Sequence, residues 1–232
     1  MINHILAVLW KQLKDTLKNK AILIQFVMFP GLTLVMENAI EIPGMPEHFF
    51  ANLFAIMYVG MAPLTAMSAI IAEEKEKNTL RVLQMCNVNA IEYLIGNAIY
   101  IIVICMLGSV TIALAGGYQG KELLTFLLIM FLGHTISILA GGAIGVFCGN
   151  QMAATSLTVP LMLVFSFLPM LSFFNETIAK VAKFFFSGQL YFMLNSLSSI
   201  EIKTETVLIL AANFLLIMAC FVLAYKKAFA KR

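Results

Sequence analysis

Long apolar stretches alternate with short polar segments along the whole chain. Six of these stretches, at about residues 21–40, 49–72, 91–117, 123–147, 153–174 and 206–225, are long enough to cross a bilayer as helices. Continuous apolar runs of this length are typical of membrane-spanning helices. The pattern therefore predicts an all-α membrane protein with six transmembrane helices in a single domain that covers residues 1–232.

The first twenty residues follow a different pattern, with apolar residues on one helical face and lysines on the opposite face. The apolar face consists of Ile2, Leu6, Leu9, Leu13 and Leu17, and the lysines are Lys11, Lys14 and Lys18. This spacing predicts an amphipathic helix over residues 1–20 that lies at the membrane interface, with its lysines near the head groups and Trp10 at the boundary. The alternative is that this segment simply extends the first spanning helix.

A dense cluster of acidic and basic residues separates the second apolar stretch from the third. Mixed charges cannot lie in hydrocarbon, so residues 73–90 are predicted to form an aqueous loop. Eleven of the 15 Lys and Arg residues fall in this loop, in its flank or near the two chain ends. Because positive charge is enriched on the cytoplasmic side, we predict a cell-membrane protein with this loop and both termini in the cytoplasm.

The charged segment also carries local signals for helix ends. Asn78 is suited to the left-handed position that terminates a helix, and Thr79 can cap a following short helix. Leu80 and Leu83 would share one face of that helix, and residues 89–92 resemble a capping box before the third span. Two successive caps favour a partner-docking element, and the alternative is a plain connector.

From Glu74 onwards the chain resembles ABC-2 type transporter permeases. The matching residues are Glu74-Lys75-Glu76-Lys77-Asn78-Thr79-Leu80-Arg81-Val82-Leu83, followed by Val88, Asn89, Glu92 and Gly96. Three positions depart from the family pattern. Asn78 replaces a Gly, Asn87 stands where Pro is usual, and Asn97 stands where Lys is common.

The resemblance implies the membrane subunit of a bacterial ABC exporter that moves a hydrophobic or amphipathic substrate, such as an antimicrobial peptide, a drug or a lipid-like molecule. In this family two permease chains, identical or different, pair with cytoplasmic ATPase subunits that bind ATP and Mg²⁺. This chain has no phosphate-binding G-x-x-x-x-G-K-[ST] motif, so we expect no catalytic residues in it. The residues expected at the ATPase contact are Glu73, Glu74, Glu76, Asn78, Thr79, Leu80, Arg81, Leu83 and Glu92.

Small residues recur at every fourth position of the fourth span, as Gly133, Ser137, Gly141, Gly145 and Gly149. Such a ridge permits close helix contact, either within one chain or between two chains. His134 lies beside this ridge, and an ionisable group at that depth is a hypothesis for a functional site. The alternative is a neutral histidine that serves packing.

Residues 175–205 mix aromatic, apolar and polar side chains. They could form short helices that enter the membrane and return, and the resemblance implies such a re-entrant hairpin between spans five and six. Non-helical backbone at membrane depth is acceptable only where protein covers it or where it lines a cavity. The alternative is a lid at the membrane surface.

Composition and motif content weigh against other classes of protein. Hydrophobic residues make up 61% of the chain and charged residues 12%, with a mean hydropathy of +0.94. The small net charge of +3 is dispersed, so nucleic-acid binding has no support. Histidines and cysteines show no metal-ligand spacing, which argues against an intramembrane metalloenzyme. A secondary transporter or channel would show matching broken helices in two halves, and this remains the alternative function.

Overall fold

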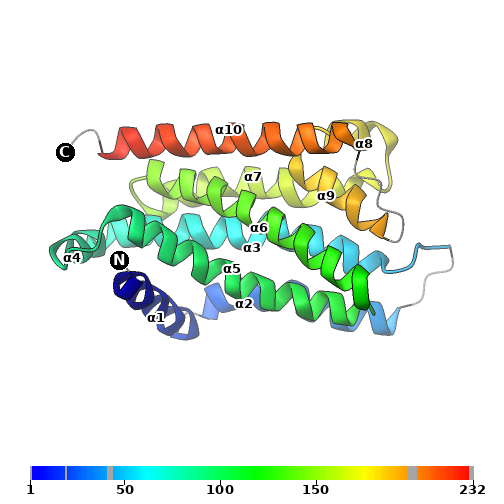
Figure 1. The fold of residues 1–232 in the computed structure, drawn as a ribbon, viewed down its shortest axis with the longest axis horizontal. Coiled ribbons are helices and arrows are strands. Elements are labelled where there is room, and N and C mark those ends of the chain that lie inside the picture. The colour runs from blue at the N-terminus through cyan, green and yellow to red at the C-terminus, as the bar shows by residue number, and fades with distance from the viewer. Residues whose placement is uncertain (1, 19, 41–43, 198–202, 230–232) are drawn as a thin grey trace.

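The computed structural model describes residues 2–18, 20–40, 44–197 and 203–229, which form a bundle of long helices (Figure 1). Within these ranges the elements are α1 (Ile2–Lys18), α2 (Lys20–Ala39), α3 (Phe49–Glu76), α4 (Thr79–Met85), α5 (Ala90–Ala115), α6 (Gly120–Phe147), α7 (Gln151–Ser172), α8 (Glu176–Ala182), α9 (Phe186–Leu194) and α10 (Thr204–Phe229). Six of the described helices, α2, α3, α5, α6, α7 and α10, are long and apolar enough to cross a membrane. The prediction of an all-α protein with six spans is confirmed.

The helix that contains the second apolar stretch extends beyond that stretch. The second apolar stretch was expected to end near Ala72 and to lead into an aqueous loop. Helix α3 instead continues to Glu76, so the first four charged residues are helical. The helix can continue there because these charges have partners on neighbouring helices, as described below. The segment between α3 and α4 is reduced to Lys77 and Asn78.

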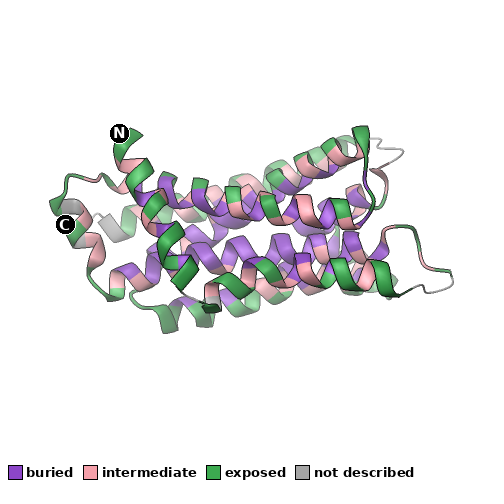
Figure 2. Ribbon diagram, turned by 90° about the horizontal axis from the view of Figure 1, so that it is seen from below, coloured by how far each residue is buried: buried purple, intermediate pink, exposed green. Residues whose placement is uncertain are grey.

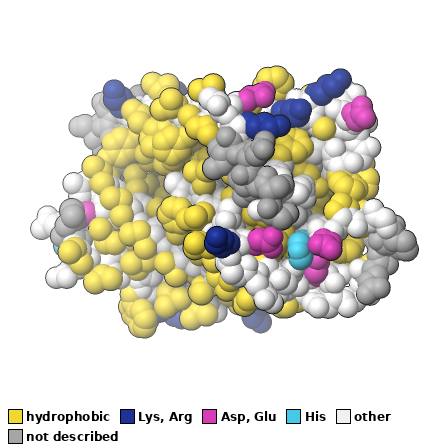
Figure 3. Space-filling model, turned by 45° about the vertical axis from the view of Figure 1, so that its right-hand side comes forward, with side chains coloured by type: hydrophobic (Ala, Val, Ile, Leu, Met, Phe, Trp, Pro, Cys, Tyr) yellow, Lys and Arg dark blue, Asp and Glu magenta, His cyan; other side chains and the backbone are white. Residues whose placement is uncertain are grey.

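Helix α3 is the centre of the bundle, and α10 lies at its edge. Within the candidate spans, 78% of the α3 window is buried and only 11% of the α10 window is. Buried residues accordingly follow the middle of the bundle, while the outer faces of the helices are exposed (Figure 2). Hydrophobic side chains cover much of the visible surface in Figure 3. An apolar exterior around a packed interior is the arrangement that a bilayer requires of a helical bundle.

The two ends of the bundle carry different elements (Figure 1). Helix α4, the start of α1 and the last turns of α10 lie at one end, which we call the α4 end. Helix α8, the end of α2 and the start of α3 lie at the other, which we call the opposite end. Helix α1 is separate from α2 and packs against α5. This packing favours a separate N-terminal helix over an extension of the first span.

The glycines of α6 bring this helix close to α3. A Cβ atom on Gly141 would lie 2.4 Å from the carbonyl oxygen of Leu64, and one on Gly145 would lie 2.8 Å from Cβ of Ile71. Gly133 similarly faces Val59, whereas Gly149 has open space around it. Three members of the predicted ridge thus serve packing within this chain, and Gly149 does not share that contact.

Helices α8 and α9 occupy the segment between the fifth and sixth spans. Most of α9 is buried, including Phe186 and Leu190. In the turn between the two helices, the carbonyl of Lys183 accepts from the Gln189 side chain at 2.6 Å, and that of Phe184 accepts from the Asn213 side chain at 2.9 Å. The non-helical backbone in this turn therefore has internal partners. That is the condition under which such a turn is tolerated at membrane depth.

Candidate functional site

The last turn of α3 and the residue after it carry five consecutive charged residues, Glu73, Glu74, Lys75, Glu76 and Lys77, which we call the charged junction. Sequence reasoning expected most of these side chains to face a soluble partner. Each of them instead has a partner within this chain, and together they contact three neighbouring helices.

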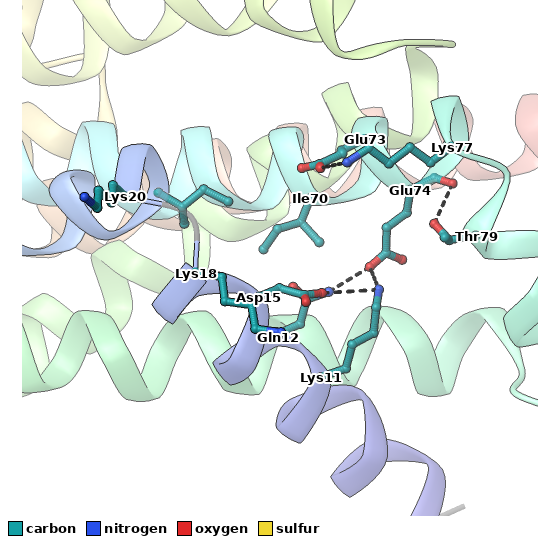
Figure 4. Close-up of a pocket in the computed structure, with 11 residues that line it drawn as sticks. Lys11, Gln12, Asp15, Lys18, Lys20, Ile70, Glu73, Glu74, Lys77 and Thr79 are labelled. Carbon is teal, nitrogen blue, oxygen red and sulfur yellow. Dashed lines mark hydrogen bonds and ion pairs between the residues drawn. The ribbon is translucent and has the colours of Figure 1, made fainter.

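Glu74 joins the charged junction to α1. Its side chain is 6% exposed, and its Oε1 accepts from the Gln12 amide at 2.8 Å and forms an ion pair with the Lys11 ammonium (Figure 4). Glu74 was expected at an ATPase contact and Lys11 near lipid head groups. In the structure these two side chains pair with each other, because burying either charge alone would cost more than pairing the two.

Lys75 and Glu76 join the charged junction to the connection between α6 and α7. The Lys75 ammonium donates to the carbonyls of Val146, at 2.7 Å, and of Cys148, at the end of α6 where carbonyls lack helical partners. The Glu76 carboxylate accepts from the backbone N–H of Gln151, at 2.9 Å, at the start of α7. A cation at a helix C-terminus and an anion at a helix N-terminus are both favourable.

Lys77 forms an ion pair with Glu73, within the charged junction itself. Its ammonium donates to Glu73 at 2.5 Å, one turn back along the helix. The hydrogen bond to Glu73 and the charge of its carboxylate raise the pKa of Lys77. Because the Lys77 side chain is largely exposed, this pair adds little to stability.

Helix α4 follows directly and is held to the end of α3. Asn78 has a φ of 56°, so the left-handed position predicted for it is confirmed. Thr79 was expected to cap α4, but it is the first helical residue. Its hydroxyl instead donates to the Glu74 carbonyl at 3.1 Å, which fixes α4 to the preceding turn. Asn87 has a φ of 58°, which proline cannot adopt, so the turn after α4 depends on the departure from the family pattern at this position.

The apolar residues of α4 divide into an inner and an outer set. Leu80 and Leu83, which were expected to face a partner, are half-buried and pack against the core of this chain. Val82 and Met85 are instead 57% and 85% exposed. Periodicity alone placed Leu80 and Leu83 on one face correctly. It could not tell whether that face turns towards the bundle or away from it.

The start of α5 is tied to α1. The backbone N–H of Asn89 donates to Glu92 at 3.0 Å, as a capping box requires. The Glu92 carboxylate also lies 2.9 Å from Nδ1 of His4. Glu92 was expected at the ATPase contact, and the structure shows it bound within the chain, where it holds α1 and α5 together.

Helix α1 turns a partly polar face towards the bundle. Val8, Gln12 and Thr16 are buried, and they recur at intervals of four. The apolar side chains expected to form the buried face of a soluble helix are exposed: Ile2 (69%), Leu6 (56%), Leu13 (38%) and Leu17 (65%), together with Trp10 (60%). This inverted arrangement matches a helix at a membrane surface, because its apolar side can enter lipid. Sequence reasoning missed Gln12 and Thr16, although their spacing from Val8 was visible.

His134 is fully buried and packed. Its Nε2 lies 2.8 Å from the Ser109 hydroxyl, which itself donates to the Cys105 carbonyl at 2.9 Å. The Tyr58 ring meets the imidazole edge-on, with centroids 5.5 Å apart. A Cβ atom on Gly108 would lie 2.4 Å from the Tyr58 hydroxyl, so this region is densely packed. The geometry favours the interpretation of His134 as a packing residue that joins α6 to α5.

The opposite end is held by an uncharged network that sequence reasoning missed. Asn52 accepts from the Tyr118 hydroxyl at 2.7 Å and donates to the carbonyl of Leu194, at 3.3 Å, and to Oδ1 of Asn195, at 3.1 Å. Burial raises the pKa of Tyr118, which therefore stays neutral. This network joins α3, the α5–α6 turn and α9. Nearby, Glu37 accepts from the Ala51 N–H at 2.9 Å, which places its charge at the start of α3.

Among the described residues, no group of His, Cys, Asp or Glu side chains could hold a metal ion. The fold and this site define a multi-pass membrane protein with its ionic contacts concentrated around the end of one central helix. A family model described as an ABC-2 family transporter protein matches residues 18–226. The chain therefore belongs to this family, as its signature indicated, and is a permease component of an ABC transporter. No curated protein matches the sequence.

Proposed function

We propose that this chain is the permease subunit of an ATP-driven exporter and that the outer side of α4 is its docking surface for a separate ATPase subunit. The family membership supports a permease that works with an ABC ATPase. The observation that carries the proposal is the exposure of Val82 and Met85 on a helix anchored to the charged junction. Exposed apolar side chains beside a charged segment are typical of protein-interaction surfaces.

In this proposal, the contacts of the charged junction transmit movement of α4 to other helices of the bundle. A partner that moves α4 also moves the end of α3, because Thr79 is bonded to Glu74. From there Glu74 reaches α1, and Lys75 and Glu76 reach the α6–α7 connection. In this proposal the α4 end faces the cytoplasm, ATP and Mg²⁺ bind to the partner, and two permease chains form the transport unit. The substrate is a hydrophobic or amphipathic molecule that moves outwards.

The proposal is tested with the double variant Val82→Asp/Met85→Asp. Burial of one such side chain is worth roughly 1.5–3 kcal/mol, and about 1.4 kcal/mol corresponds to a tenfold change in affinity. We therefore expect the variant to bind the ATPase subunit at least about tenfold more weakly in a pull-down, with membrane insertion intact. Phe184→Asp is the matched control, because Phe184 is 72% exposed in the α8–α9 turn at the opposite end.

The substrate and the partner chains are identified by isolation of the protein from its native membrane. We expect an ATP-binding subunit to accompany it, alone or with a second type of permease chain. Isolation without any ATP-binding protein, under conditions that preserve other membrane complexes, would contradict the proposed function.

A further inference from the structure

A cavity at the α4 end lies between α1, the start of α2 and the last turns of α3 (Figure 4). Its volume is about 650 Å³, within the range of cavities that hold small ligands. Lys11, Gln12, Asp15 and Lys18 of α1, Lys20 and Ile22 of α2, Ile70, Glu73 and Glu74 of α3, and Lys77 and Thr79 line it. The cavity shares Thr79 and Glu74 with the anchor of α4, but the exposed docking residues Val82 and Met85 do not line it.

The cavity is lined by four lysines and three carboxylates, so its lining has a net charge of +1. Lys11 is paired with Glu74, and Lys77 is paired with Glu73. Lys18 and Lys20 have no hydrogen-bond or ion-pair partner among the described residues, and both are exposed. Asp15 lies 3.9 Å from Lys11 and is itself largely exposed. The uncompensated lysines therefore favour a ligand with negative charge.

The position of the cavity indicates where that ligand comes from. Ile22 is the first residue of the first candidate span, and Ile70 lies within the second, which ends at Glu76. The cavity thus straddles the boundary between water and hydrocarbon. On the other side of α1 from the cavity, Leu13 and Leu17 are exposed, which is consistent with a helix that lies at this boundary. Phosphate groups of phospholipids lie at this depth, and basic pockets on spanning helices bind their head groups.

We propose that this cavity is a binding site for the phosphate group of an anionic phospholipid in the leaflet on the α4 side. Lys18 attracts the phosphate as a point charge, Lys20 adds positive charge at the rim of the cavity, and the acyl chains run outwards past Ile22. The lipid contacts α1, α2 and α3 together, so it stabilises the docked position of α1. A soluble anion or an acidic partner protein would satisfy the lysines, but neither would use the apolar side chain of Ile22 at the edge of the first candidate span.

Native mass spectrometry of the purified full-length chain tests the proposal. The chain is equilibrated in detergent with phosphatidylglycerol, with phosphatidylcholine of the same acyl chains, or with inorganic phosphate. We expect phosphatidylglycerol to be retained in preference to phosphatidylcholine. Lys18→Gln/Lys20→Gln should weaken its binding about 30-fold, since each lysine near a membrane surface contributes a several-fold attraction for anionic lipid.

Two further variants keep the result interpretable. Lys14→Gln is the matched control, because Lys14 lies on the same helix outside the cavity, with its ammonium 5.1 Å from the Trp10 ring centroid. It should leave the lipid preference unchanged, and Lys18→Arg/Lys20→Arg should retain it. An equal preference for both lipids in the unmodified chain would overturn the proposal, as would a preference that survives Lys18→Gln/Lys20→Gln. Displacement of the lipid by millimolar phosphate would assign the site to a soluble anion instead.

Discussion

The two ends of the bundle are held together by different chemistry. At the α4 end, long charged side chains reach from the end of α3 to α1 and to the α6–α7 connection. At the opposite end, the buried Asn52 and Tyr118 form uncharged contacts with each other and with the end of α9. Apart from the buried Glu74 carboxylate, the ionic contacts at the α4 end involve partly exposed side chains that can exchange with water at little cost, whereas a buried amide that loses its partners cannot. The difference indicates that the α4 end is built to rearrange and that the opposite end is built to stay fixed.

The largest effect is expected from breaking the uncharged network. Asn52→Leu would leave the Tyr118 hydroxyl and two acceptors at the end of α9 without their partner. Each unsatisfied buried group costs about 1–3 kcal/mol, so the thermal midpoint of the purified protein should fall substantially. Asn38→Leu is the control, since Asn38 is exposed and its side chain donates to the Leu34 carbonyl of its own helix. Equal midpoints for the two variants would show that the network does not fix this end.

A smaller loss is expected where α6 packs on α3 between the two ends. Gly141→Ala would place a methyl group 2.4 Å from the Leu64 carbonyl oxygen, and overpacking of this kind costs about 1–3 kcal/mol. Gly149→Ala adds the same methyl group in open space and should leave the thermal midpoint unchanged or slightly raised. If both variants behaved alike, close α3–α6 packing would not explain the glycine ridge.

At the charged junction, Glu74→Gln should release α1 with little effect on global stability. The variant keeps a polar side chain near Gln12 but loses the ion pair with Lys11, at a cost of about 1 kcal/mol. Faster amide hydrogen exchange confined to α1 would reveal this release. Asp15→Asn is the control, because Asp15 is largely exposed at 3.9 Å from Lys11. Faster exchange throughout the bundle in Glu74→Gln would contradict a local role.

The smallest expected effect is a difference in salt dependence. Screening weakens partly exposed ion pairs such as Lys77–Glu73, which are worth about 0–1 kcal/mol, and leaves a buried neutral network unaffected. An increase from low to high salt should therefore speed hydrogen exchange slightly in α1 and α4 but not in α9. An equal response at both ends would remove the electrostatic distinction between them.

The spans, the short helix α4 and the left-handed Asn78 could be predicted because hydropathy and cap signals are local in sequence. The partners of the charged junction could not, since Lys75 meets carbonyls that lie about seventy positions further along the chain. Leu80 and Leu83 illustrate the same limit: their shared face was predictable, but its direction depends on how α4 packs against the core. Asn52 and Tyr118 gave no local signal of their contact across 66 positions.

The central proposal is that α4 contacts an ATPase subunit. Site-specific photocrosslinking tests this contact directly. A photoreactive residue at position 85, where Met85 is 85% exposed, should form an adduct with an ATP-binding subunit in native membranes. The same residue at position 184, at the opposite end, should form none with that subunit. An adduct with the ATPase from position 184, or its absence at position 85 in a complex that transports normally, would contradict the account.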